Sequence, residues 1–381
     1  DLAKKTIKNK KYFIGNIKYR DNRMKKFNVL DLFSGAGGFS CGLDSLENFR
    51  TVVATDLDKH ALSTFKNNFP HTKCILGDIS SSEIKREIVK NALELEVNMI
   101  IGGPPCQGFS LKGKNLGLND PRNFLFLEYL DIVDKIKPEI VIIENVKNMI
   151  NSSKGFFIRE IILRLEKLGY KTSYGILSAH CFGVPQKRER AIVIAYKGRK
   201  IIPLPFSENK KILTVRDAIS DLSYLNSGEG KFEDYYQMDS QSEYQKRMRK
   251  NNRTIYNHIA TNHSQIALEK LSLIPPEGDK SSLPKELHGN QKFSTTWARL
   301  EWDQPSPTID TRFDTPSNGK NSHPYLNRAI TPREAARIQS FPDDFIFFGP
   351  KTSICKQIGN AVPPLLARAI GEHIEKELYD E

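Results

Sequence analysis

Between Phe27 and about residue 199 the chain alternates short apolar runs with longer amphipathic stretches. The apolar runs are rich in β-branched residues, which suit a pleated and covered surface, so we interpret them as buried strands. They read FNVLDLF, TVVATDLD, VNMIIGG, EIVIIEN and AIVIAY. The stretches between them have helical spacing, as from Ile158 to Leu168, where Gly169 provides a stop. Strands that alternate with helices predict an α/β fold with a mostly parallel sheet.

The alternation stops near Lys197, and residues 200–327 are richer in polar residues and in proline. This composition predicts a separate, smaller and loop-rich domain. A helix start follows, with Thr331 as N-cap, Pro332 at the first position and Glu334 completing a capping box. We therefore expect four parts, which are a basic arm at 1–26, a first domain at 27–199, a second domain at 200–327, and a segment at 328–381 that returns to the first domain.

Charge and cysteine content narrow the classes of function. The chain has 57 Lys and Arg against 45 Asp and Glu, a formal charge of +12. This excess favours a polyanionic partner, because neutralised phosphates release counterions, although a lysine-rich composition alone gives the same charge. No run approaches the ~20 apolar residues of a membrane helix, so we expect no membrane partner. Five scattered cysteines without a CxxC pair predict no disulfide framework, no metal and a cytoplasmic location.

Polar turns follow the first strands of the predicted sheet. Glycines at such a turn let a ligand approach the backbone at a helix N-terminus. A carboxylate at the end of the next strand suits the ribose hydroxyls of an adenosine-type ligand. The residues are Gly35, Gly37 and Gly38 after the first strand, Asp56 at the end of the second, and Asp78 with Ile79 further on. Together they predict a nucleoside cofactor and leave open whether it is NAD or S-adenosylmethionine.

The segment GGPPCQGFS, residues 102–110, contains a candidate nucleophile. Pro104 and Pro105 fix the backbone just before Cys106 and remove two N–H donors. The thiol therefore sits on a rigid corner, where neighbouring N–H groups can stabilise the thiolate. The alternative is an ordinary buried cysteine, but two flanking glycine-containing stretches are poor core sequence. We expect Cys106 to be reactive.

A carboxylate and two arginines are candidates to work with this thiol. Glu144 follows the apolar run EIVII and emerges at a strand end. Arg188 and Arg190 alternate in QKRER, so their side chains share a face. If Glu144 faces Cys106, it is a general acid toward a base edge, and one arginine holds the base carbonyl while the other anchors a phosphate. A solvated strand-terminal glutamate and an exposed basic turn remain the alternatives.

The order of these motifs resembles the C5-cytosine-specific DNA methyltransferase family, in its bacterial and phage restriction–modification form. The motifs are DLFSGAGGFS, TDLD, GDI, GGPPCQGFS, ENV, QKRERAIVIA, TPREAARIQSFPD and QIGNAVPP. They cover about residues 29–199 and 327–365, and the domain between them matches only at Thr308-Ile309. The resemblance implies a Rossmann-like S-adenosylmethionine-dependent methyltransferase fold, with residues 200–327 as the target-recognition domain and 328–381 as hinge and returning segment.

The resemblance also implies a role for individual residues. Cys106 would add to C6 of cytosine, Glu144 would hold N3 and the exocyclic amine, Arg190 would hold O2, and Arg188 would contact backbone nearby. The cofactor positions would be Phe33 stacked on adenine, Asp56 on the ribose, Asp78 and Ile79 at the adenine edge, Pro105 and Leu125 in the pocket wall, and Asn360 and Val362 in the closing segment. Leu57 stands where some relatives carry an aromatic ring. DNA contacts are expected from Gln107, Ser110, Arg299, Thr308, Ile309 and Arg312.

The resemblance implies an enzyme that methylates duplex DNA, acts as a monomer and needs no metal. Whether a cognate restriction endonuclease is its functional partner is left open by the sequence. One branch of the family methylates tRNA and carries a Cys-Phe-Thr tripeptide, to which CFG at Cys181 is the nearest match here. A DNA-binding regulator without activity is a second alternative. A Rossmann oxidoreductase is a third, but it gives PPCQ and ENV no role.

Overall fold

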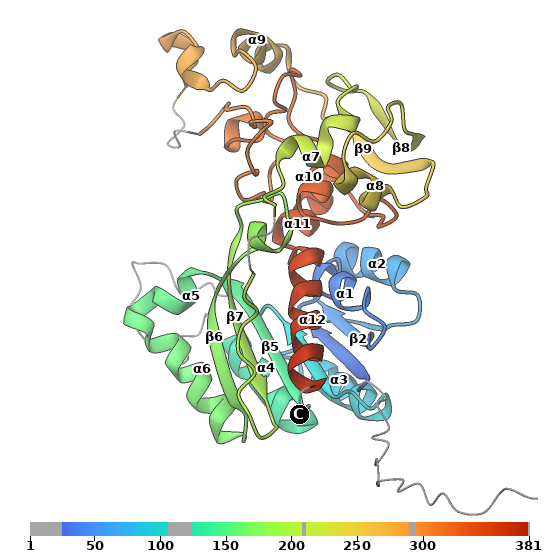
Figure 1. Ribbon diagram of the computed structural model, residues 1–381, viewed down its shortest axis with the longest axis vertical. Coiled ribbons are helices and arrows are strands. Elements are labelled where there is room, and N and C mark those ends of the chain that lie inside the picture. The colour runs from blue at the N-terminus through green and yellow to red at the C-terminus, as the bar shows by residue number, and fades with distance from the viewer. Residues whose placement is uncertain (1–24, 106–123, 208–210, 290–294, 380–381) are drawn as a thin grey trace, which may run out of the picture.

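The computed structural model describes residues 25–105, 124–207, 211–289 and 295–379. Almost all of the predicted basic arm, and the predicted site residues Cys106, Gln107 and Ser110, lie outside the described residues. Figure 1 shows two lobes, with the large sheet in one lobe and short helices and a small hairpin in the other. None of the helices within the described ranges is long and apolar enough to cross a membrane.

A seven-stranded sheet, in the order β3-β2-β1-β4-β5-β7-β6, forms the first lobe. Its strands are β1 (Phe27–Leu32), β2 (Phe49–Asp56), β3 (Lys73–Leu76), β4 (Met99–Gly102), β5 (Ile140–Val146), β6 (Lys171–Ser178) and β7 (Glu189–Tyr196). Strands β1 to β5 pair in parallel, and β7 runs antiparallel to both β5 and β6. The α/β class with a mostly parallel sheet is confirmed.

Helices cover both faces of this sheet, because its central strands are apolar on both sides. One face packs against α3, α4 and α6, and the other packs against α1 and the last helix, α12. The helices are α1 (Gly38–Leu43), α2 (Lys59–Asn68), α3 (Ser82–Glu94), α4 (Phe124–Ile136), α5 (Asn148–Asn151), α6 (Phe156–Lys167) and α12 (Pro364–Tyr379). Leu366, Ile370 and Ile374 of α12 are fully buried against the strands, so the C-terminal helix is part of this lobe (Figure 1).

The second lobe is assembled from short elements. They are α7 (Val215–Ile219), β8 (Gly230–Tyr235), α8 (Glu243–Arg249), β9 (Thr254–Ile259), α9 (Gln265–Leu273), α10 (Pro332–Ile338) and α11 (Lys351–Asn360). Its short 3-10 turns lie at Ser220–Leu222, Lys280–Ser282, Lys285–Leu287 and Pro316–Asn318, whereas those at Ser152–Gly155 and Ala179–Phe182 belong to the first lobe. The predicted helix start is confirmed, since the Thr331 hydroxyl accepts from the Glu334 N–H and the Glu334 carboxylate accepts from the Thr331 N–H.

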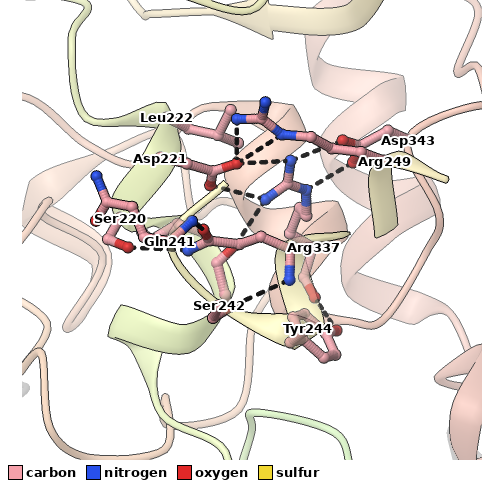
Figure 2. A network of polar contacts seen from close by, with 12 residues as sticks. Ser220, Asp221, Leu222, Gln241, Ser242, Tyr244, Arg249, Arg337 and Asp343 are labelled. Carbon is pink, nitrogen blue, oxygen red and sulfur yellow. Dashed lines mark hydrogen bonds and ion pairs between the residues drawn. The ribbon is translucent and has the colours of Figure 1, made fainter. Parts of the chain in front are cut away.

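Buried charge organises the core of this second lobe. Arg337 of α10 is fully buried and lies between Asp221 and Asp343, with Nη1–Oδ1 and Nε–Oδ1 distances of 2.9 and 2.6 Å (Figure 2). Arg249 of α8 binds the same Asp221 carboxylate, and Arg328 pairs with the buried Glu334. Removing one partner from such a network strands an uncompensated charge in a low-dielectric interior, so these pairs fix how the short elements fit together.

Candidate active site

A cavity of about 650 Å³ opens at the carboxyl ends of β1, β2, β4 and β5, the edge at which α/β sheets bind ligands. The predicted residues that line it are Phe33, Gly35, Gly38, Asp56, Leu57, Asp78, Ile79, Pro105, Leu125, Glu144, Arg188, Arg190, Asn360 and Val362. Gly37 is not among the lining residues. It adopts φ +95 at the N-cap of α1, and a Cβ there would lie 2.7 Å from the Phe69 ring, so it serves the turn itself.

One half of the cavity is built to hold a polar ligand beside Asp56. The Gly35 N–H donates to Asp56 Oδ2 and the Asp58 N–H donates to Oδ1, both at 2.8 Å, so the carboxylate is fixed by backbone. Burial raises the pKa of Asp56, and these two bonds oppose that rise. The hydroxyls of Ser34 and Thr55, which also line the cavity, are buried without a partner among the described residues. A nucleoside ligand with further polar groups fits this set of donors and acceptors.

The other half holds the predicted acid and guanidinium. Arg190 Nε lies 2.9 Å from Glu144 Oε1, and both side chains are largely buried. Burial raises the pKa of Glu144, while the charges of Arg190 and Arg188 oppose the rise. In the antiparallel pairing of β5 and β7, Arg190 lies opposite Val146. Glu144 precedes Val146 by two residues on the same strand, so the side chains of Glu144 and Arg190 lie on the same face of the sheet. A carboxyl with a raised pKa can hold a proton for a base edge.

Arg188 joins the cavity to the rest of the molecule. Its guanidinium is buried and donates to the carbonyl oxygens of Ile309 at 3.2 Å and Gly359 at 2.8 Å. Burial and the neighbouring Arg190 lower the pKa of Arg188 to about 9. Arg188 is therefore not part of an exposed basic turn, the alternative that the sequence left open. It connects the start of β7 to the second lobe, through Ile309 and through Gly359 of α11.

A corner of backbone leads from β4 toward position 106. The Asn145 side chain donates from Nδ2 to the Pro104 carbonyl oxygen at 2.7 Å, and its Oδ1 accepts from the Val146 N–H. A Cβ at Gly103 would lie 2.9 Å from Glu144 Oε2, so the corner passes directly against the candidate acid. Asn145 was missed as a site residue from the sequence, although its place beside Glu144 in the ENV motif was a usable signal.

The expected DNA contacts in the second lobe divide into two groups. Thr308 and Arg312 are exposed, and the Thr308 hydroxyl donates to the Lys187 carbonyl oxygen at 2.9 Å. The Ile309 side chain is buried, and its N–H donates to Gln186 Oε1. These contacts place the Thr308-Ile309 pair directly beside the QKRER segment.

The structure corrects the DNA contact expected from Arg299. Only 1% of this residue is exposed, and its guanidinium donates to backbone carbonyl oxygens of the second lobe. The acceptors are the carbonyls of Leu271, Ile274, His323 and Leu326 and the side chain of Asn327. With its donors directed inward, Arg299 ties the loop after α9 to residues 323–327 and has no face for a nucleic acid.

Comparisons with known proteins agree with this geometry. The family model for C-5 cytosine-specific DNA methylase matches residues 27–376. The chain is 37% identical over 349 residues to Type II methyltransferase M1.HphI of Haemophilus parahaemolyticus, covering 91% of this chain and 86% of the relative. It is 35% identical over 384 residues to Type II methyltransferase M.DdeI of Desulfomicrobium norvegicum, covering 91% and 88%.

Solved structures give the same result. A protein crystallised as a DNA modification methyltransferase, encoded within an E. coli prophage, superposes with a TM-score of 0.75 at 27% identity and covers 93% of this chain and 100% of that one. DNMT2 of Spodoptera frugiperda shares the fold with a TM-score of 0.57 at 18% identity. The chain belongs to the C-5 cytosine-specific DNA methylase family.

Proposed function

We propose that this enzyme transfers a methyl group from S-adenosylmethionine to C5 of a cytosine flipped out of a specific duplex DNA sequence, with Cys106 as nucleophile. One observation carries the proposal. A single cavity joins a nucleoside-binding half around Asp56 to a base-binding half formed by Glu144 and Arg190. The Pro104-Pro105 corner, which immediately precedes Cys106, lines the same cavity.

The residue types match what the chemistry requires. Cytosine C5 is a poor nucleophile, and addition of a thiolate at C6 raises the electron density at C5. The addition develops negative charge at N3 and O2, which a protonated Glu144 and the Arg190 guanidinium neutralise. S-adenosylmethionine supplies the electrophilic methyl group. Loss of the C5 proton and of the Cys106 thiolate then restores the aromatic ring and frees the enzyme.

The pKa of Glu144 supports its role as the acid. Burial favours the neutral carboxyl and raises the pKa of Glu144, which is the direction that a proton donor to N3 of the base requires, while the charges of Arg190 and Arg188 oppose that rise. Arg190 stays close enough to Glu144 to keep that carboxyl oriented, since Nε and Oε1 are 2.9 Å apart. The two side chains thus hold one edge of the pyrimidine while the thiolate attacks the opposite edge.

The target cytosine must leave the duplex, because C5 and C6 of a stacked base are out of reach of a side chain. Enzymes that modify a base, methyltransferases among them, therefore extrude it into a pocket. We place sequence readout in the second lobe, where Thr308 and Arg312 are exposed and Thr308 lies against Lys187. Phosphate contacts position the duplex there, and base contacts specify the sequence.

We further propose a bacterial restriction–modification setting, in which the enzyme acts as a cytoplasmic monomer and protects host DNA from a cognate endonuclease. The support is the identity of 37% and 35% to two bacterial Type II methyltransferases. The proposed reaction needs no metal ion.

Transfer of labelled methyl groups tests this function. The unchanged enzyme should label duplex DNA and leave tRNA unlabelled, whereas Cys106→Ser should bind the duplex and transfer nothing. Label on tRNA alone would reassign the substrate. Near-normal turnover by Cys106→Ser would remove the nucleophile assignment, and tight duplex binding without transfer by either protein would favour the DNA-binding regulator.

A further inference from the structure

A second cavity, of about 470 Å³, lies between the two lobes and shares no lining residue with the active site. We call it the back pocket. Its lower wall comes from α1, the end of α2 and the start of α12, and its upper wall from α8 and the turn at 340–345. Figure 1 shows α8 of the second lobe next to α1 and α2 of the first. The volume lies within the roughly 300–1,000 Å³ range of small-molecule sites.

The upper wall of the back pocket is rigid, because the buried charge network holds it. Asp343 binds Arg337 through its carboxylate, and its backbone N–H donates to the Met248 carbonyl oxygen at 2.9 Å. Arg249, next to Met248 on α8, is bound by Asp221, which also binds Arg337 (Figure 2). A fully satisfied polar network of this kind fixes its surroundings, so α8 and the turn present preorganised side chains to the pocket.

Three cations line the back pocket. Arg247 is exposed and makes no hydrogen bond or ion pair with any residue that the structure describes. Lys250 pairs with Asp344, and Arg368 pairs with Glu372 at 2.8 Å. Of these three cations, Arg247 is the one whose N–H donors are all available to a ligand. A guanidinium prefers a partner that it can bind through two hydrogen bonds, such as phosphate.

Apolar groups and one partly buried carboxyl form the rest of the back pocket. Phe69 and Phe345 lie with ring centroids 6.0 Å apart, and Met248 contributes a third apolar surface. Asp44 accepts from the Thr51 N–H and hydroxyl with Oδ1, at 2.9 and 2.8 Å, and no described group donates to its Oδ2. Asp44 is thus an acceptor for a ligand N–H or O–H.

We propose that the back pocket binds a mononucleotide. The aromatic base has the flat apolar surface that Phe69, Phe345 and Met248 accommodate. The phosphate meets Arg247, with Lys250 and Arg368 beside it, and an amino or hydroxyl group of the nucleoside donates to Asp44. The walls belong to both lobes, so a bound nucleotide bridges them in the arrangement that the structure shows. This inference does not depend on the assignment of Cys106.

Calorimetric titration with adenosine 5′-monophosphate tests the proposal. The titration is done with saturating S-adenosylhomocysteine, so that an adenosine ligand cannot enter the active-site cavity instead. We expect saturable binding at one site. Arg247→Ala should weaken it by about tenfold or more, because a hydrogen-bonded charged contact is lost. Ser45→Trp should abolish it, since Ser45 is an exposed residue of the lower wall and a large ring there fills the opening.

Lys246→Ala is the matched control. Lys246 is the neighbour of Arg247 on α8 and is exposed, but it pairs with Glu243 and does not line the pocket. It should bind the nucleotide within about twofold of the unchanged protein. Melting temperature and methyl transfer verify that all three variants fold.

Three results with the mononucleotide would overturn the proposal. They are no binding at millimolar nucleotide, binding that S-adenosylhomocysteine removes, and equal affinity in Arg247→Ala and Lys246→Ala. Arg247-dependent binding of a short DNA duplex, without binding of the mononucleotide, would assign the cations to nucleic acid and also overturn it.

Discussion

Replacing Asn145 tests whether the corner before Cys106 is held from β5. Pro104 and Pro105 have no N–H, so this stretch cannot anchor itself through its own backbone donors. Asn145 Nδ2 instead holds this stretch from outside, because it donates a hydrogen bond to the Pro104 carbonyl oxygen at 2.7 Å. Asn145 is only 6% exposed. Asn145→Ala removes that donor and leaves a buried carbonyl oxygen without a partner.

The size of the effect follows from this geometry. An unsatisfied buried acceptor costs about 1–3 kcal/mol. If that cost falls on the conformation of the corner that presents Cys106 to the base, the rate constant for methyl transfer drops by about 5-fold to about 150-fold, at 1.36 kcal/mol per factor of ten. Binding of S-adenosylmethionine should change little, because Asp56 lies at the end of β2 and its backbone donors lie in the turns that follow β1 and β2.

Single-turnover methylation of duplex DNA measures this directly, since product release does not enter the rate. Asn67→Ala is the control, because Asn67 donates only to the Ser63 carbonyl oxygen on an exposed face of α2. A rate for Asn145→Ala within twofold of that control would refute the positioning role. An equal loss of cofactor affinity would instead indicate general damage to the cavity.

Two further predictions concern stability. Arg337→Met should lower the free energy of unfolding by about 3–5 kcal/mol, because Asp221 and Asp343 stay buried without their shared cation; a loss below about 1 kcal/mol in urea denaturation would contradict this. Asp31→Asn should raise the melting temperature, and by more at pH 8 than at pH 5. Burial raises the pKa of Asp31 to about 8, so the folded chain retains a proton that the unfolded chain releases near pH 4, and the loss of stability from this difference occurs in the unsubstituted protein and is absent from the variant. A gap in melting temperature that is constant with pH would contradict it.

Much of the first lobe was predictable because buried parallel strands leave a simple pattern. Continuous apolar runs identified the central strands, and the carboxyl ends of parallel strands meet at one edge, which brings Asp56 and Glu144 to the same cavity. Strand β6, Lys171–Ser178, was not identified as a strand. It lies at the edge of the sheet and is partly exposed along most of its length, so it lacks a continuous apolar run.

The second lobe shows where a sequence pattern stops being informative. Arg299 was expected to contact DNA as a residue of the target-recognition domain, yet five acceptors from other parts of the second lobe surround its guanidinium. Arg337 also has a distant partner, because the Asp221 carboxylate lies 116 residues earlier in the chain. No local spacing encodes such partners, because they meet only when the short elements of the lobe are assembled. The ENV motif drew attention to Glu144, the neighbour of Asn145, but it did not indicate the hydrogen bond of Asn145 itself, because the acceptor lies 41 residues earlier.

Trapping with 5-fluorocytosine tests the covalent chemistry most directly. Bisulfite sequencing of DNA from a host that expresses the protein first identifies the methylated sequence. A duplex with 5-fluorocytosine at that position is then incubated with enzyme and S-adenosylmethionine, and the adduct is digested and located by mass spectrometry. The fluorine cannot leave C5 as a proton does, so we expect a denaturant-stable adduct on the peptide that contains Cys106. Methylation of ordinary cytosine without any such adduct, or an adduct on another cysteine, would contradict the mechanism.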